Sequence, residues 1–194
     1  MQAARGASLN TSEPDHVPTA PPADRSRFLV ILAVVALVGY VVDVVSKIVA
    51  VRELSDGRTV PLLGDWFGLH LTRNPGAAFG TGTSFTVGLS LIAIVALVVV
   101  LVLARRLGSL GWALGLGFLL AGVAGNLTDR LLREPGPLRG HVVDFFQLPN
   151  WPIFNVADIC INVAAGVIIL QSLRGIRIDG RRASGEAAPG ESVP

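Results

Sequence analysis

The sequence is poor in charge and in cysteine. Only 15% of its 194 residues are charged, while 51% are hydrophobic and the mean hydropathy is +0.60. An ordinary soluble domain carries about 25% charged residues, so the deficit favours a protein of the lipid bilayer. The single cysteine, Cys160, lies in an apolar stretch. It excludes a disulfide within the chain and a cysteine-rich metal site.

Histidine pairs and basic clusters are also missing. The three histidines, His16, His70 and His141, are scattered and form no HExxH pair, which argues against a zinc protease. The net charge is only +2, and no basic run is interleaved with aromatic residues, so we expect no nucleic-acid partner. We expect neither a metal ion nor a cofactor.

Four long apolar stretches dominate the chain, at about 28–51, 85–103, 110–132 and 154–173. A helix of about 20 residues crosses a hydrocarbon core of about 30 Å, and only helices and closed barrels satisfy their backbone groups in lipid. The stretches are continuous and do not alternate, so they predict helices. We therefore expect a mainly α, multi-pass integral membrane protein, with one domain over residues 28–174.

The first of these stretches has an alternative interpretation. Arg25 and Arg27 precede it, as basic residues precede the apolar core of a cleavable signal peptide. It is long for such a core, and no A-x-A-like site ends it. These features favour a retained membrane helix.

The two ends of the chain and the loops differ in charge. Residues 1–27 and 175–194 lack apolar periodicity and predict disordered tails. Arginine is frequent in both tails and at Arg105–Arg106, whereas the loops at about 52–84 and 133–153 dilute arginine with acids. The positive-inside rule then predicts that both termini are cytoplasmic and that the two loops face outward.

The first outer loop has some pattern of its own. Residues 59–72 mix Val, Leu, Trp and Phe with two glycines, and 69–72 alternate in polarity. Short strands at the membrane surface would produce this pattern. The alternative is an irregular loop that Trp66 anchors at the interface.

Polar residues stand near the ends of two apolar stretches, where a plain membrane anchor would have none. Asp43 and Lys47 are four residues apart and share a helix face, either as an ion pair near the interface or in support of a site. Asn126, Asp129 and Arg130 also share a face, after a run of glycines that favours close helix packing. Arg130 alone could snorkel to the interface.

Two further acids flank the last outer loop. Asp144 lies inside the apolar hexamer 141–146, and Asn155 and Asp158 open the fourth stretch. Asn155 is a reasonable N-cap, whereas Asp158 lies beyond the cap and has no such local role. If Asp144 and Asp158 converge in a low dielectric, they share one proton. One carboxyl then activates water while the other polarises a peptide carbonyl.

Four motifs resemble, in order and spacing, those of the bacterial lipoprotein signal peptidases, or signal peptidase II. They are Asn74–Gly80, Gly125–Arg130, Val143–Phe145 and Phe154–Asp158, and the resemblance covers about residues 28–174. It implies an aspartic endopeptidase that removes signal peptides from prolipoproteins, cutting just before a cysteine that already bears diacylglyceryl. It also implies four transmembrane helices with a small extracytoplasmic β-cradle, in the bacterial inner membrane.

The resemblance assigns roles by motif, and the catalytic pair is Asp144 and Asp158. The polar positions that line the site and position the substrate are matched by Asn74, Asn126, Arg130 and Asn155. The supporting positions are matched by Asp43, Lys47 and Asp129. For Asp129 we expect a structural role, such as pairing with an arginine or capping.

The expected partners are the diacylglyceryl-modified prolipoprotein and membrane lipid, and nothing in the sequence requires more than a monomer.

A small transporter or channel component is the main alternative function, since intramembrane acids also relay protons. It predicts polar groups at mid-membrane, yet the stretch 85–103 is uncharged. A serine protease built on Ser46 and Lys47 is disfavoured because adjacent helical residues point apart and no GxSxG elbow is present. A non-catalytic scaffold leaves the acids unexplained.

Overall fold

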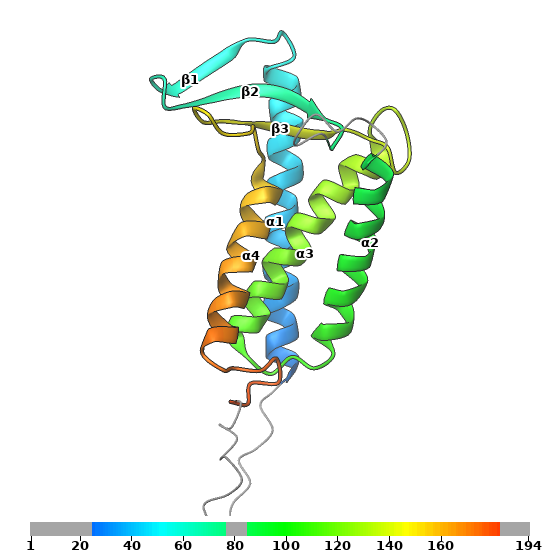
Figure 1. Ribbon diagram of the computed structural model, residues 1–194, viewed down its shortest axis with the longest axis vertical. Coiled ribbons are helices and arrows are strands. Elements are labelled where there is room, and N and C mark those ends of the chain that lie inside the picture. The colour runs from blue at the N-terminus through cyan, green and yellow to red at the C-terminus, as the bar shows by residue number, and fades with distance from the viewer. Residues whose placement is uncertain (1–24, 77–84, 183–194) are drawn as a thin grey trace, which may run out of the picture.

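The computed structural model describes residues 25–76 and 85–182 of the chain (Figure 1). Within these ranges it has four helices and one three-stranded sheet. In chain order the elements are α1 (Arg25–Glu53), β1 (Thr59–Leu63), β2 (Phe67–Asn74), α2 (Phe85–Ala104), α3 (Leu110–Leu132), β3 (Val142–Gln147) and α4 (Val156–Leu173).

The four helices are long and apolar enough to cross a membrane. Their outward side chains remain exposed, as expected of residues that face lipid and not water. Examples from three helices are Leu37 at 63%, Ile92 at 66% and Ile169 at 58% exposed. The predicted class, a mainly α membrane protein with four spans and a small sheet, is confirmed.

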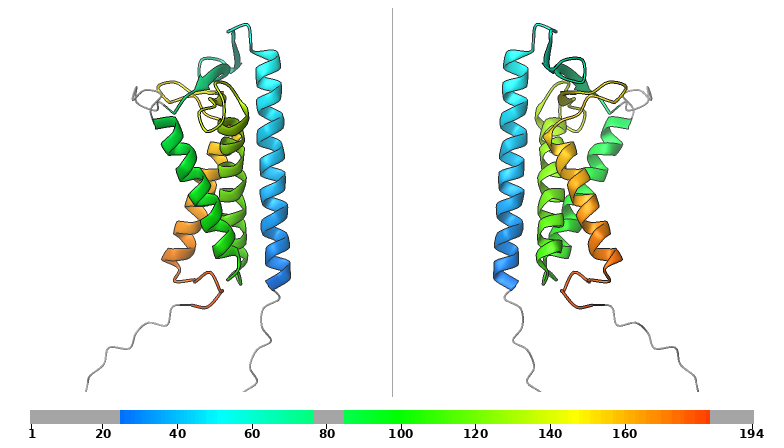
Figure 2. Two further views of the ribbon diagram at one scale, coloured as in Figure 1. Left: turned by 90° about the vertical axis from the view of Figure 1, so that its right-hand side faces the viewer. Right: turned by 90° about the vertical axis from the view of Figure 1, so that its left-hand side faces the viewer.

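Helix α3 is the centre of the bundle and packs against α1, α2 and α4 (Figures 1 and 2). Glycines permit this close approach. A Cβ atom on Gly117 would lie 3.0 Å from the carbonyl oxygen of Leu32 in α1. A Cβ atom on Gly122 would overlap the carbonyl oxygen of Ala157 in α4. The glycine-rich sequence of α3 thus lets both neighbours reach its backbone.

The sheet has the antiparallel order β1-β2-β3 and lies across the end of the bundle where α1 ends and α4 begins (Figure 1). The strands predicted within 59–72 are confirmed, and the irregular-loop alternative is wrong. Strand β3 was not predicted. The sequence analysis noted residues 141–146 only as an apolar segment that contains Asp144. In the sheet Asp144 is the register partner of Thr72 on β2. Val143 and Phe145 pack with Ala50 of α1 and with Leu54, which follows that helix.

The ends of the elements differ from the predicted bounds. Helix α1 begins at Arg25 and not at 28, and α4 begins at Val156 and not at 154.

Residues 175–182, expected to be disordered, form an ordered hook below α4; we call this segment the C-terminal hook. Its backbone meets the α2–α3 turn, where the Gly108 N–H donates to the Ile178 carbonyl at 2.9 Å. These backbone hydrogen bonds depend on long-range contact and leave no sequence periodicity. The remaining tail residues, 1–24 and 183–194, lie outside the described ranges.

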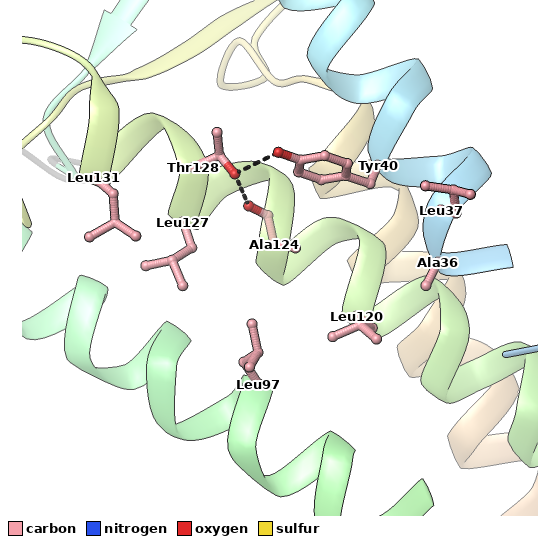
Figure 3. Close-up of a pocket in the computed structure, with 9 residues that line it drawn as sticks. All are labelled: Ala36, Leu37, Tyr40, Leu97, Leu120, Ala124, Leu127, Thr128 and Leu131. Atoms are coloured by element: carbon pink, nitrogen blue, oxygen red, sulfur yellow. Dashed lines mark hydrogen bonds between the residues drawn. The ribbon is translucent and has the colours of Figure 1, made fainter. Parts of the chain in front are cut away.

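A lipid-facing groove of about 320 Å³ runs between α1 and α2, with α3 as its floor (Figure 3). Its walls are aliphatic apart from one hydroxyl pair, Tyr40 Oη and Thr128 Oγ1, which lie 3.2 Å apart. Thr128 also donates to the carbonyl of Ala124 at 2.8 Å. None of the predicted site residues lines this groove, so it is separate from the acids described next.

Candidate active site

The residues predicted to form a site gather beneath the sheet, around the start of α4. Asp43 and Lys47 come from α1, Asn74 from β2, and Asp144 from β3. Helix α3 supplies Asn126, Asp129 and Arg130, and Asn155 and Asp158 open α4. Asp144 and Asp158 face one cavity of about 450 Å³. Other residues that line it are Asn74, Trp151, Pro152, Ile153, Phe154, Ile159, Asn162 and Val163.

Asn155 is hydrogen-bonded to both of these acids. Its Nδ2 donates to Asp144 Oδ1 at 2.6 Å, and its backbone N–H donates to Asp158 Oδ2 at 3.1 Å. In return, the Asp158 N–H donates to Asn155 Oδ1 at 3.0 Å, which completes a capping box. The N-cap interpretation of Asn155 is therefore confirmed. The inference that Asp158 lies beyond the cap is wrong, because Asp158 occupies position N3 of the helix and belongs to the same capping box.

Asn126 on α3 connects Asp158 to the rest of the network. Its Nδ2 donates to Asp158 Oδ1 at 2.9 Å. Its Oδ1 accepts from Asn155 Nδ2 at 3.1 Å and from Lys47 Nζ at 3.0 Å. Both oxygens of Asp158 therefore accept hydrogen bonds, one from α3 and one from the N-cap of α4, which fixes the orientation of this carboxylate.

Asn74, at the end of β2, holds the outer oxygen of Asp144. Its Nδ2 donates to Asp144 Oδ2 at 2.9 Å, and its Oδ1 accepts from the Gly76 N–H at 2.8 Å. Gly76 has a φ of +102°, which is accessible to glycine. The motif that contains Asn74 continues through residues 77–80, which lie outside the described ranges.

Asp144 is almost fully buried, with 2% of its surface exposed. Burial raises its pKa from 3.8 to about 6. The hydrogen bond from Asn74 acts in the opposite direction, and the negative charge of Asp158 adds to the rise. The protonated form of Asp144 therefore persists into mildly acidic solution, which suits a carboxyl pair that shares one proton.

Lys47 is the hub of a buried ionic network behind the acids. Its Nζ lies 2.8 Å from Asp43 Oδ2, 3.0 Å from Asp129 Oδ2 and 3.0 Å from Asn126 Oδ1. The ammonium thus forms ion pairs with two carboxylates and donates a hydrogen bond to Asn126. The exposed fractions are 1% for Lys47, 0% for Asp43 and 4% for Asp129. The expected ion pair between Asp43 and Lys47 is thus present, and its burial and its hydrogen bond to Asn126 also fit the alternative, support of a site.

Asp43 and Asp129 each hold the backbone beside one of the two acids. Asp43 Oδ1 accepts from the N–H of Ala157 at 2.8 Å, immediately before Asp158. Asp129 Oδ2 accepts from the N–H of Val143 at 3.1 Å, immediately before Asp144. The other oxygen of Asp129 pairs with Arg133 one turn later. The expected pairing of Asp129 with an arginine is thus present.

Arg130 is half-buried beside the acids. Its Nη1 is shielded from solvent and, within the described ranges, has no hydrogen-bond partner. The negative charges of Asp144, Asp129 and Asp158 act on its guanidinium. The burial of Nη1 favours an inward-facing arginine over the snorkelling alternative.

Asn162 was missed by the sequence reasoning. It lines the cavity, and its Nδ2 donates to the Asp158 carbonyl at 2.9 Å. A signal was present, since Asn162 follows Asp158 by four residues and is polar within an apolar helix.

Trp151 also lines the cavity and is 64% exposed. No sequence periodicity distinguished it from other loop residues. Among the described residues, no group of three His, Cys, Asp or Glu side chains is arranged to hold a metal ion.

Comparison with known families and relatives gives consistent matches. Residues 35–174 match the family model described as signal peptidase (SPase) II. The lipoprotein signal peptidase of Mycolicibacterium smegmatis is 47% identical over 169 residues, 86% of this chain and 72% of that protein. The lipoprotein signal peptidase of Leifsonia xyli subsp. xyli is 48% identical over 161 residues, 82% of this chain and 74% of that protein.

A solved structure has the same fold. It is a bacterial membrane enzyme determined by the in meso method at 1.9 Å resolution. The TM-score is 0.63 at 24% sequence identity, with 77% of this chain and 94% of the other covered. The arrangement of four helices and a small sheet is therefore shared beyond the range of close sequence similarity.

Proposed function

The chain belongs to the signal peptidase II family of aspartic peptidases, and we propose that its catalytic pair is Asp144 and Asp158. The observation that carries this proposal is the position of Asn155, which hydrogen-bonds both carboxyl groups at the edge of one cavity. The transporter alternative is not supported, because the family and its relatives are peptidases.

In the proposed reaction the pair binds one proton between its two carboxyl groups. The ionised carboxyl takes a proton from a water molecule as the water oxygen attacks the carbonyl carbon of the scissile peptide. The protonated carboxyl donates to the carbonyl oxygen and stabilises the tetrahedral intermediate. A proton then passes to the leaving nitrogen as the C–N bond breaks. The asparagines that donate to the two carboxyls keep them oriented without a change of charge, so little reorganisation is needed.

The proposed substrate is the signal peptide of a prolipoprotein whose cysteine bears diacylglyceryl, cut just before that cysteine. The cavity is suited to a substrate that is part peptide and part lipid. Asn74 and Asn162, which line the cavity, carry side-chain amides that can bind a peptide backbone. On the α4 side the cavity is lined by Ile159 and Val163, which are 43% and 40% exposed. Acyl chains attached to the substrate could therefore stay in the bilayer.

The proposed orientation places the sheet and the site outside the bacterial cell membrane and both termini in the cytoplasm. Its support is the charge of the opposite end, where exposed arginines gather at the start of α1, at the α2–α3 turn and after α4. The site is formed by one chain, so we propose that a monomer in contact with membrane lipid is active.

The test is cleavage of a diacylglyceryl-modified prolipoprotein by the purified protein in detergent with a chelator present. The wild type is expected to cut before the modified cysteine, and Asp144→Asn and Asp158→Asn are expected to leave the substrate intact. Asp179→Asn, which changes an exposed acid at the opposite end, is the matched control and should retain activity. Full activity in either dyad variant would contradict the assignment. Equal cleavage of the unmodified precursor would contradict the substrate class.

A further inference from the structure

The end of the bundle opposite the sheet carries a concentrated positive charge. Eight exposed arginines lie there: Arg25, Arg27, Arg105, Arg106, Arg174, Arg177, Arg181 and Arg182. Among the described residues the only acid at this end is Asp179. Within the same ranges, no ion pair joins any of these arginines to an acid. The surface therefore presents unneutralised guanidinium groups at the level where membrane helices end.

Two of these arginines line the same cavity. Arg106 from the α2–α3 turn and Arg177 from the C-terminal hook border a space of about 340 Å³. The other residues that line it are Leu103, Trp112, Ile178 and Asp179. We call this space the arginine pocket. Its lining joins two cations to apolar and aromatic surface, a combination suited to an amphiphile and not to a fully hydrated ion.

The arginine pocket is a built feature, because hydrogen bonds fix the hook that carries Arg177. Trp112 Nε1 donates to the Ile176 carbonyl at 2.8 Å, and the Gly108 N–H donates to the Ile178 carbonyl at 2.9 Å. Within the hook, the Arg177 N–H donates to the Arg181 carbonyl at 2.9 Å. The hook sits directly on Gly108, where an added Cβ atom would overlap the Asp179 carbonyl.

We propose that the arginine pocket binds the phosphate headgroup of an anionic phospholipid. Guanidinium groups bind phosphate oxygens through paired N–H donors, and two cations held at one cavity repel each other until an anion lies between them. Asp179 lines the same cavity, but its Oδ1 accepts from the Arg181 N–H at 3.1 Å. The phosphate is therefore placed on the side of Arg106 and Arg177. The glycerol and acyl chains lie along Leu103 and Trp112, toward the apolar surface of the bundle.

A bilayer lipid fits these features better than a soluble phosphate. The pocket lies at the end of the spanning helices, and Trp residues favour the interface between headgroups and hydrocarbon. Basic pockets between helix ends are a general mode of binding anionic headgroups. A bound lipid would attach the hook, and through it the ends of α2, α3 and α4, to one leaflet. This role is independent of the cleavage chemistry at the other end of the bundle.

The test measures retention of phosphatidylglycerol and of phosphatidylcholine with the same acyl chains by the purified full chain, using native mass spectrometry from detergent. The wild type is expected to retain phosphatidylglycerol preferentially and to melt at a higher temperature in its presence. The double variant Arg106→Gln/Arg177→Gln should bind phosphatidylglycerol about tenfold more weakly. Arg25→Gln/Arg174→Gln removes the same charge outside the pocket and should bind like the wild type.

A second variant separates geometry from charge. Gly108→Ala retains all eight arginines but displaces the hook, so it should also lose the preference for phosphatidylglycerol. Cleavage activity at the far end of the bundle reports whether each variant is folded. Equal weakening in both double variants would show a diffuse charge effect and overturn the proposal. Binding of inorganic phosphate as tight as that of phosphatidylglycerol, or wild-type binding by folded Gly108→Ala, would overturn it too.

Discussion

Asn155 and Asp158 cap the start of α4 reciprocally, each accepting a hydrogen bond from the backbone N–H of the other at 3.0–3.1 Å. Asp158 therefore has a local structural role in addition to the catalytic role proposed for it. Asn155 in turn donates from its side chain to Asp144 at 2.6 Å. The helix cap and the proposed catalytic pair are one hydrogen-bonded unit, so variants must be chosen to separate folding from chemistry.

Two variants at Asp158 should separate the two roles. Asparagine keeps a side-chain oxygen that can accept from the Asn155 N–H, whereas alanine removes it. We expect both variants to lower cleavage by at least about 10³-fold, but only Asp158→Ala to lose about 1 kcal/mol of stability with the cap. Cleavage assays and thermal unfolding in detergent measure the two effects. Residual activity near the wild-type level in Asp158→Asn would remove Asp158 from the reaction.

The raised pKa of Asp144 predicts a pH-dependent stability. Because the folded state holds the Asp144 proton more tightly than the unfolded state, the stabilisation is present at low pH. It is lost as the pH rises from about 4 through about 6. A pKa of about 6 in place of 3.8 corresponds to about 3 kcal/mol. The melting temperature of Asp144→Asn, measured against the wild type, should therefore rise between pH 4 and 7. Parallel pH profiles for the two proteins would show that Asp144 does not titrate as argued.

Lys47 should be essential for stability although it does not line the cavity. Lys47→Met leaves Asp43 buried without its cation and leaves Asp129 with Arg133 as its remaining ion-pair partner among the described residues. Breaking a buried ion pair costs about 3–5 kcal/mol. Thermal unfolding should show a large loss, whereas Arg52→Met, at a residue whose side chain is 83% exposed, should have little effect.

A second substitution should recover part of the stability lost in Lys47→Met. Asp43→Asn removes one buried charge but keeps an oxygen for the Ala157 N–H. The double variant Lys47→Met/Asp43→Asn is therefore expected to unfold at a higher temperature than Lys47→Met alone. A double variant less stable than the single one would contradict the electrostatic argument.

The packing of α3 on α4 predicts that two glycines respond differently to alanine. An added Cβ atom on Gly122 would overlap the carbonyl oxygen of Ala157, which is backbone and cannot rotate away. Gly122→Ala should therefore separate the helices, lower the melting temperature and reduce cleavage, since Ala157 precedes Asp158. Gly166→Ala on α4 meets nothing within 4 Å and should be neutral or slightly stabilising. Equal behaviour of the two variants would contradict the close-contact argument.

The sequence was a good guide wherever the determinant was local or repetitive. Apolar length alone located the four helices, because a bilayer requires long uninterrupted apolar segments. Alternation of polarity within 59–72 indicated strands. Strand β3 was not predicted, because its mostly apolar residues do not alternate in the same way. The hook was not predicted for a different reason. It is held by hydrogen bonds from the Gly108 N–H and from the Trp112 side chain, and these leave no repeat in the sequence.

By itself the sequence determined that the chain crosses a bilayer and that its acids stand near the ends of apolar segments, since hydropathy and residue identity are properties of the chain. Only the tertiary structure decided which groups meet. Lys47 pairs with Asp129 across 82 positions, and Asn74 holds Asp144 across 70. Such contacts depend on how closely α3 and the sheet approach their neighbours. Glycine at the helix crossings permits that approach, and the hydrogen-bonding needs of buried polar groups then fix the partners.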